Sequence, residues 1–90
     1  YSVYQNYPNP FNPTTTIYYD LPEQTDVEIT VHDMIGRNVR TLINQNQSAG
    51  MKSVFWDARD ANGNQLSSGI YIYRVSAGSF TATKKMVLLK

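Results

Sequence analysis

Apolar and polar side chains alternate along most of this chain, and this alternation restricts the possible folds more than any other feature. Between Asp26 and His32, the apolar residues Val27, Ile29 and Val31 occupy every second position. Successive side chains of a β-strand point to opposite faces, so this spacing is typical of a strand with one buried face. No stretch keeps the 3.6-residue period of an amphipathic helix. The sequence therefore predicts an all-β protein.

Turn-forming residues divide the chain into short strands. We expect strands over residues 14–21, 26–32, 37–43, 51–57, 69–77 and 80–89. The polar stretches 44–50 and 57–64 are expected to be loops, and Gly36 is expected to take the positive-φ position of a hairpin. Regularly spaced short strands of this kind favour an antiparallel β-sandwich of about seven strands.

The segment Tyr7–Pro13 contains three prolines, two asparagines and two aromatic rings. Each proline fixes φ and lacks an amide donor, so we expect a stiff, extended arm that joins the sheet only at Thr14. Tyr7 and Phe11 are expected to hold this arm against the sandwich. Residues 1–13 are therefore predicted to be a proline-rich segment at the end of a linker, and residues 14–90 the sandwich domain.

Composition argues against several classes of function. The chain has no cysteine and a net charge of +1, which leaves no thiol chemistry and no electrostatic case for nucleic acid or an anionic membrane. No apolar run is long enough to span a bilayer. The only histidine, His32, precedes Asp33 on a predicted strand, where neighbours point to opposite faces, so a catalytic His–Asp pair is not expected. We predict neither an enzyme nor a bound cofactor.

Two binding functions stay open at this stage. The loop that contains Asp57, Asp60, Asn62 and Asn64 offers oxygen ligands for a non-standard calcium site, although the same side chains are also suited to bonding turn amides. Several aromatic rings suggest a sugar-stacking platform, although the alternation places the tryptophan in the core. These rings are Trp56, Tyr4, Tyr7, Tyr71 and Tyr73.

Four segments are more informative together than singly. They are PNPFNPTTTIYYDLP, VEITVHDMIGRNVRTL, AGMKSVFWDARDANGNQLSSGIYIYRV and the terminal KKMVLLK. In this order and spacing they resemble the type A C-terminal sorting domain of the type IX secretion system, a family that overlaps with the Ig-like domain of flagellar hook-capping proteins. The resemblance runs from about Tyr7 to Lys90 and implies an Ig-like β-sandwich. The chain departs from the family at Ala58, where glycine is common, and at His32, where an aromatic residue is frequent.

The resemblance also implies a function. Such a domain is a non-enzymatic sorting signal at the end of a covalently linked N-terminal passenger, which reaches the periplasm by a separate signal. The outer-membrane secretion machinery recognises the domain, a sortase-like peptidase removes it, and the passenger becomes secreted or attached to the cell surface. We expect cleavage at or before the proline-rich arm. A structural Ig-like module that supports a neighbouring domain is the alternative.

The family motifs fall into two groups on this chain. One group is expected to be structural, and its members are Pro8, Asn9, Pro10, Asp33, Gly36, Arg37, Gly69 and Tyr71. The other is the predicted recognition element, because two lysines, four apolar residues and a final lysine exceed what a strand needs. Its members are Lys84, Lys85, Met86, Val87, Leu88, Leu89 and Lys90. A buried last strand with solvated lysines is the alternative interpretation of this terminal motif.

Overall fold

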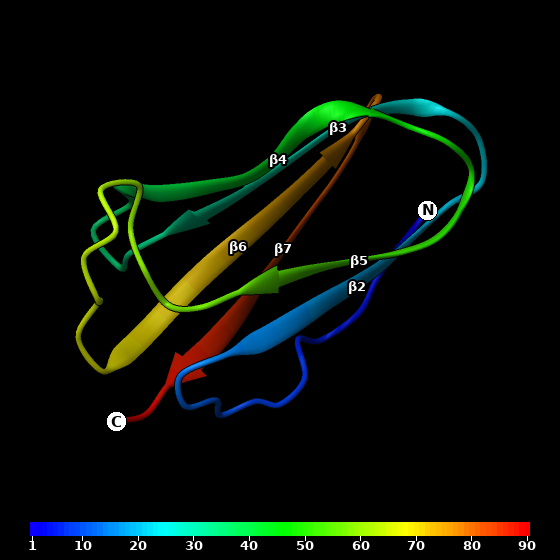
Figure 1. Cartoon of the computed structure of the whole chain (residues 1–90). Helices are drawn as coiled ribbons and strands as arrows, with labels where there is room; N and C mark the ends of the chain where they lie inside the picture. The colour runs from blue at the N-terminus through cyan, green and yellow to red at the C-terminus, as the bar shows by residue number, and fades with distance from the viewer.

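A computed structural model describes all residues, Tyr1–Lys90, and contains seven strands and no helix (Figure 1). It therefore contains no helix that could cross a membrane. The strands are β1 (Ser2–Val3), β2 (Thr15–Leu21), β3 (Thr25–His32), β4 (Asn38–Gln47), β5 (Gly50–Trp56), β6 (Gly69–Ala77) and β7 (Phe80–Leu88).

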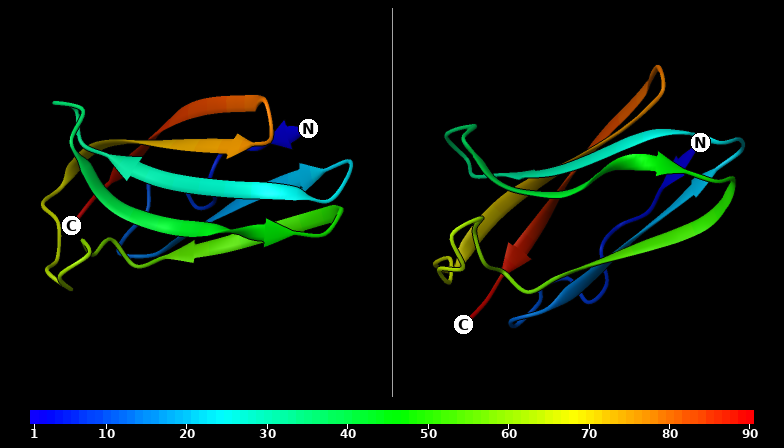
Figure 2. Two further views of the ribbon diagram at one scale, coloured as in Figure 1. Left: turned by 90° about the horizontal axis from the view of Figure 1, so that it is seen from above. Right: turned by 45° about the horizontal axis from the view of Figure 1, so that its top comes forward.

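The strands form two antiparallel sheets that face each other, as the sequence predicts. One sheet has three strands in the order β1-β2-β5, and the other has four in the order β4-β3-β6-β7. Two further views show the two layers and the long β6–β7 hairpin that extends past its neighbours (Figure 2). This architecture confirms the predicted seven-stranded β-sandwich.

The core is filled by the inward-facing side chains of both sheets. Val27, Ile29 and Val31 are at most 1% exposed, which confirms the alternation on β3. The same alternation predicts that Thr30 lies on the opposite, solvent-facing side of the strand, but Thr30 is only 7% exposed. This expectation was wrong because β3 lies between β4 and β6, where Thr30 is flanked on the outer face by its register partners Thr41 and Arg74.

Pairing in the sheet also corrects the predicted loop at 44–50. β4 continues to Gln47, and its residues Asn44–Gln47 pair with Thr25–Glu28 of β3. Only Ser48 and Ala49 separate β4 from β5. The side chains of this stretch are largely exposed on an edge strand, so the hydrophobic pattern is missing while the backbone ladder persists.

The N-terminal residues join the sheet earlier than Thr14, contrary to the sequence-based expectation. Ser2 and Val3 pair with Asp20 and Tyr19 of β2, before the first proline. Tyr7 then forms an isolated bridge with Thr16. The prolines do not exclude pairing, because the non-proline residues between them still donate and accept. The division of the chain at residue 13 stays a prediction.

Of the two rings expected to hold the arm in place, only one is buried. Phe11 is 1% exposed and packs at a ring-centroid distance of 5.8 Å from Trp56. Tyr7 is 74% exposed, so its predicted clamping role is wrong. The arm is held there by backbone hydrogen bonds instead, because the amide of Tyr7 donates to the Thr16 carbonyl and its carbonyl accepts from the Thr16 amide.

Candidate recognition site

The terminal motif predicted as a recognition element divides between core and surface. Met86 and Leu88 are fully buried. Lys85 and Lys90 are exposed, and Leu89 is 51% exposed. The motif therefore combines two interior anchors with a small set of side chains that a partner could reach, in agreement with the alternative interpretation of a buried last strand.

The arm and the terminal strand, which are far apart in sequence, form one structural unit. The arm lies along the outer edge of β7, where Phe11 forms a parallel bridge with Leu88. The Phe11 amide donates to the Val87 carbonyl, and the Leu89 amide donates to the Phe11 carbonyl, both at 2.9 Å. The arm thus protects the edge that carries the terminal motif.

One side chain of the arm and one that precedes it reinforce this seam. Asn9 accepts a 2.9 Å hydrogen bond on Oδ1 from the Val87 amide. Gln5 donates from Nε2 to the Lys85 carbonyl at 2.7 Å. Asn9, predicted to be structural, therefore connects the proline motif directly to the terminal motif.

A buried polar node fixes the start of the arm. Asn6 is only 2% exposed, and its amide donates to the Tyr73 hydroxyl at 2.9 Å. The Tyr73 hydroxyl in turn donates to the Tyr4 carbonyl at 2.8 Å. Burial raises the pKa of Tyr73 to about 12, against a smaller lowering by the Asn6 amide, so this hydroxyl remains a donor at neutral pH.

The Asn6 side chain and Thr15 complete the node. Asn6 Nδ2 donates to Thr15 Oγ1 at 3.0 Å and to the Pro8 carbonyl at 3.2 Å, and the Thr15 hydroxyl donates to the same carbonyl at 2.9 Å. Sequence reasoning missed Asn6, Thr15 and Tyr73. The one indication in the sequence was Tyr73 itself. A tyrosine at an interior position of a strand buries its hydroxyl, and a buried hydroxyl needs a hydrogen-bond partner.

The proline motif contributes to both the node and the seam. The Pro8 carbonyl is an acceptor within the node, and Pro10 directly precedes Phe11, which bridges to Leu88. The peptide bonds that precede Pro8, Pro10 and Pro13 are cis.

The hairpin motif forms a closed turn between β3 and β4. Asp33 Oδ1 accepts from the amides of Ile35 and Arg37, both at 3.0 Å, and Oδ2 lies 2.9 Å from Arg37 Nε. Gly36 has a φ of 96°, as expected for this position. Partial desolvation would raise the pKa of Asp33, but these hydrogen bonds and the guanidinium outweigh it and lower the pKa.

The central-strand motif anchors the adjoining loop. Tyr71 is 6% exposed, and its hydroxyl donates to the Ser67 carbonyl at 2.7 Å. Its ring meets Trp56 edge-on at 6.0 Å. Gly69 begins β6 just before it. Tyr71 therefore holds the loop from residue 57 to 68 against the core.

The loop from residue 57 to 68 contains a second turn, of the same kind as the Asp33 turn. Asp60 Oδ1 accepts from the amides of Asn62 and Asn64, and Gly63 has a φ of 85°. The Asn64 amide is the largest cause of a lowered pKa at Asp60. The turn role expected of these side chains is observed for Asp57, whose Oδ1 accepts from the Arg59 amide at 3.3 Å, and for Asp60. Asn62 and Asn64 take part through their backbone amides. The structure has no cluster of three or more His, Asp or Glu residues that could hold a metal ion.

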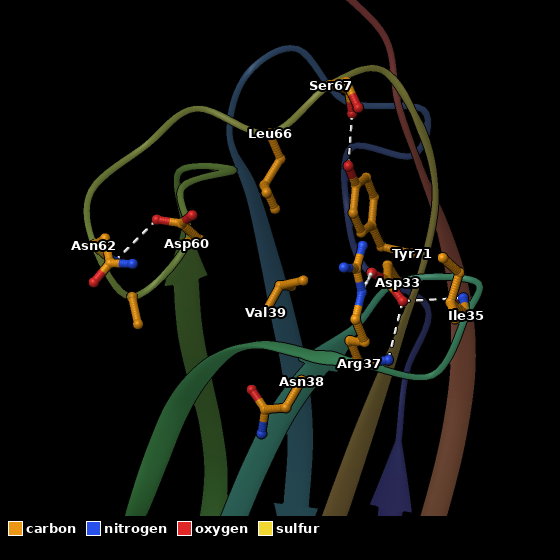
Figure 3. Close-up of a pocket in the computed structure, with 11 residues that line it drawn as sticks. Asp33, Ile35, Arg37, Asn38, Val39, Asp60, Asn62, Leu66, Ser67 and Tyr71 are labelled. Carbon is orange, nitrogen blue, oxygen red and sulfur yellow. Dashed lines mark hydrogen bonds and ion pairs between the residues drawn. The ribbon is translucent and has the colours of Figure 1, made fainter.

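A groove of about 590 Å³ separates the two turns (Figure 3). Asp33, Ile35 and Arg37 line one side, and Asp60 and Asn62 line the other. Both carboxylates face backbone amides of their own turns, and His32 contacts Thr30 and not Asp33. The groove therefore shows no catalytic constellation of the Ser-His-Asp kind.

The suggested sugar-stacking platform does not form from the expected rings. Trp56, Tyr71 and Tyr73 are at most 6% exposed. Trp56 Nε1 donates to the Arg59 carbonyl at 3.0 Å, inside the structure. Of that set, only Tyr4 and Tyr7 are exposed, so the five rings cannot present one flat face to a glycan.

Ala58 occupies the position where glycine was expected from the resemblance, and its backbone explains that preference. It is the one residue other than glycine with positive φ, at 62°. An L-residue in this left-handed region costs about 1–2 kcal/mol. The Ala58 methyl group is buried, and burial of one methyl contributes about 0.8 kcal/mol in compensation. The departure therefore leaves the local turn intact.

Solved structures of two proteins from Porphyromonas gingivalis share this architecture. PorZ, an essential bacterial surface component of the type IX secretion system of Porphyromonas gingivalis, is 25% identical with a TM-score of 0.68, and the match covers 99% of this chain and 12% of PorZ. Dimeric latent PorU from Porphyromonas gingivalis is 19% identical with a TM-score of 0.77, covering 97% of this chain and 9% of PorU. At 19% identity, the PorU likeness shows the fold alone.

A third similar structure is FlgD from P. aeruginosa. It is 29% identical with a TM-score of 0.64, and the match covers 82% of this chain and 57% of FlgD. This chain thus spans only part of each of these proteins. No curated protein matches the sequence. Residues 11–80 match the FlgD Ig-like domain family, and since this range is most of the chain, the protein belongs to that family of Ig-like domains.

Proposed function

We propose that this Ig-like domain is a non-enzymatic sorting domain that directs a covalently linked passenger through the outer-membrane machinery of type IX secretion. Its similarity to PorZ, at 25% identity over 99% of this chain, supports an extracytoplasmic, secretion-related role. A sortase-like peptidase would then release the passenger for secretion or attachment to the cell surface. The domain itself would be recognised, and would catalyse nothing.

The seam between the arm and the terminal strand is the observation that carries this proposal. The match to the FlgD Ig-like family begins at residue 11 and ends at residue 80. Most of the arm and nearly all of β7 therefore lie outside the matched range. These two segments are hydrogen-bonded to each other along Lys85–Leu89. A secretion partner would therefore find, on one side of the sandwich, a surface that is not part of the shared family core.

The exposed members of the terminal motif are the proposed contact residues. Lys85, Leu89 and Lys90 lie at the surface, whereas Met86 and Leu88 would act indirectly, by holding the strand in the core. A deletion of residues 84–90 would remove both buried anchors and destabilise the sandwich, at about 2–5 kcal/mol for each large side chain lost. Point substitutions therefore separate recognition from folding better than a deletion.

Cleavage is proposed to occur before β1. Residues 2–11 are fixed to β2 and β7 by backbone hydrogen bonds and by the Asn6 node. A peptidase needs an extended, accessible backbone, which this bound segment does not offer. The passenger would therefore be released without disrupting the sandwich.

An export assay tests the proposal. A reporter with a signal peptide and this domain at its C-terminus is produced in a bacterium that has the type IX machinery. We expect the reporter at the cell surface, and we expect the triple variant Lys85→Ala/Leu89→Ala/Lys90→Ala to remain in the periplasm with an unchanged melting temperature. Lys52→Ala, on the opposite sheet, is the matched control. Full surface display of the triple variant would contradict the proposed contact residues, and periplasmic retention of the unmodified fusion would contradict the sorting function.

A structural module is the second candidate function. It is favoured by the 29% identity to FlgD, of which the match covers 57%, because the same sandwich then serves in a protein outside type IX secretion. In that case, removing the domain would lower the melting temperature of the neighbouring domain and leave export unchanged.

A further inference from the structure

The outer edge of β7 is covered over only half its length. The arm bonds to both backbone groups of Val87 and to the Leu89 amide, and Gln5, just before the arm, bonds to the Lys85 carbonyl. Because backbone groups alternate in direction along a strand, the groups of Thr81 and Thr83 and the Lys85 amide point to the same outer edge. β6 is the only strand that pairs with β7. The outward backbone groups of Thr81 and Thr83 and the outward amide of Lys85 therefore have no hydrogen-bond partner in the protein.

This free edge is accessible and has the side chains of a good strand. Thr81, Thr83 and Lys85 are all exposed. Threonine favours extended backbone, and an unpaired row of amides and carbonyls is a template for an added strand. The right-hand view of Figure 2 shows the tip of the β6–β7 hairpin extending past its neighbours. Tyr1 stacks on Phe80 at this tip, with ring centroids 5.2 Å apart, so the exposed edge begins after Phe80.

The charges near this edge indicate which kind of strand would bind there. The hairpin from Gly69 to Leu88 has no acidic residue and three basic ones, Arg74, Lys84 and Lys85. Arg74 is the register partner of Thr83, so its charge lies one strand from the edge. A second copy of this edge would bring lysines against lysines, which disfavours self-pairing. An acidic strand would meet complementary charge.

We propose that the free edge of β7, from Thr81 to Lys85, binds an extended acidic segment of a partner protein as an additional β-strand. Backbone hydrogen bonds would provide affinity, and the flanking lysines would set the preference for glutamate or aspartate. This inference does not depend on the sorting function, because the edge and its charge are properties of the isolated domain.

The test uses the ¹⁵N-labelled 90-residue chain and two capped synthetic peptides, one of four Thr-Glu repeats and one of four Thr-Lys repeats. Titration with the Thr-Glu peptide should shift the amide signals of Thr81, Thr83 and Lys85 in a saturable way. The Thr-Lys peptide should bind at least about tenfold more weakly, a difference of about 1.4 kcal/mol. Shifts confined to another surface, or no saturable shift with the Thr-Glu peptide, would overturn the proposal.

A matched pair of variants tests the edge itself. Thr83→Pro removes an outward amide without breaking the ladder to β6, and proline is tolerated at such edge positions. Thr83→Pro should lower the affinity for the Thr-Glu peptide about tenfold or more, whereas Thr83→Ala should change this affinity less than about threefold. Equal binding by both variants would rule out strand addition.

Charge reversal keeps the test decisive if Thr83→Pro disturbs folding. The variant Lys84→Glu/Lys85→Glu should no longer bind the Thr-Glu peptide and should instead bind the Thr-Lys peptide. An unchanged preference would refute the role of the lysines. A dimer of the unmodified chain in sedimentation, abolished by Thr83→Pro, would show that a second copy occupies the edge and would likewise overturn the proposal.

Discussion

The domain contains the same turn twice, and the two copies differ in what they show to solvent. In the Asp33 turn and the Asp60 turn, an aspartate accepts from the amides two and four residues later, and a glycine three residues later has positive φ. The first turn carries Met34 and Ile35 between aspartate and glycine, and the second carries Ala61 and Asn62.

Comparing the two turns shows which residue types the turn geometry requires and which positions tolerate different side chains. Aspartate and glycine are present in both copies because they satisfy amides and relieve backbone strain. Met34 is 57% exposed and Ile35 is 79% exposed, although the second turn shows that small or polar residues serve equally well. Because the fold does not need these two exposed apolar side chains, they can be exchanged to test whether this tip contacts a partner.

Exchange of the turn tips should have the largest effect. Met34→Ala/Ile35→Asn gives the first turn the tip of the second. We expect stability to change by less than about 0.5 kcal/mol, because both side chains are exposed. If this tip contacts the secretion partner, surface display of a fused reporter should fall about tenfold, since burial of one such side chain contributes about 1.5–3 kcal/mol. Surface display is measured by protease accessibility on intact cells.

The reciprocal exchange controls for a nonspecific effect. Ala61→Met/Asn62→Ile places the apolar tip on the second turn. Added to the first variant, it should not restore export, because the tip is then on the other side of the groove. Restoration would show that apolar surface alone is sufficient.

Substitution of the glycines should give the next largest effect, and it should be equal in the two turns. A Cβ at Gly36 or Gly63 would meet no atom within 4 Å, so only backbone strain contributes. Alanine at either position should cost about 1–2 kcal/mol and lower the melting temperature by about 5–15 °C. Thermal denaturation of Gly36→Ala and Gly63→Ala measures this, and a loss confined to one of them would break the equivalence.

The two turns also show what sequence could predict. Local chemistry was sufficient for Asp33, Gly36 and the buried face of β3, because each is decided by neighbours in the chain. The polar end of β4 was missed, because its strand depends on pairing with β3 and not on side-chain pattern. The Asn6 node was missed for a similar reason: its partner Tyr73 lies 67 residues away, and no local rule joins two such positions.

The burial of Met86 and Leu88 in the terminal motif follows the same logic. Met86 and Leu88 alternate with Lys85 and Val87, which was a strand signal, but the run of four apolar residues hid the alternation. The arm that covers this strand could not be inferred from either segment alone, because the seam consists of backbone hydrogen bonds between opposite ends of the chain.

Acidification should destabilise both turns. The pKa values of Asp33 and Asp60 are lowered in the folded protein, so each carboxylate stabilises the fold above its unfolded pKa of 3.8. That stabilisation is lost as the pH falls through the lower folded value. Melting temperatures between about pH 5 and pH 2 should therefore fall less steeply for Asp33→Asn and Asp60→Asn than for the unmodified protein. Parallel curves for all three proteins would contradict a turn role for these carboxylates.

The smallest expected effect distinguishes the two turns by salt. Arg37 pairs with Asp33 through its side chain at 2.9 Å, but the equivalent residue of the second turn, Asn64, carries no charge. The guanidinium is mostly exposed, so the pair is screened by salt and contributes little. Arg37→Gln should lower the melting temperature slightly in dilute buffer and not at all in about 1 M sodium chloride, where the screening length is about 3 Å. Asn64→Gln should show no salt dependence. A salt-independent loss in Arg37→Gln would mean that the arginine acts through packing and not through its charge.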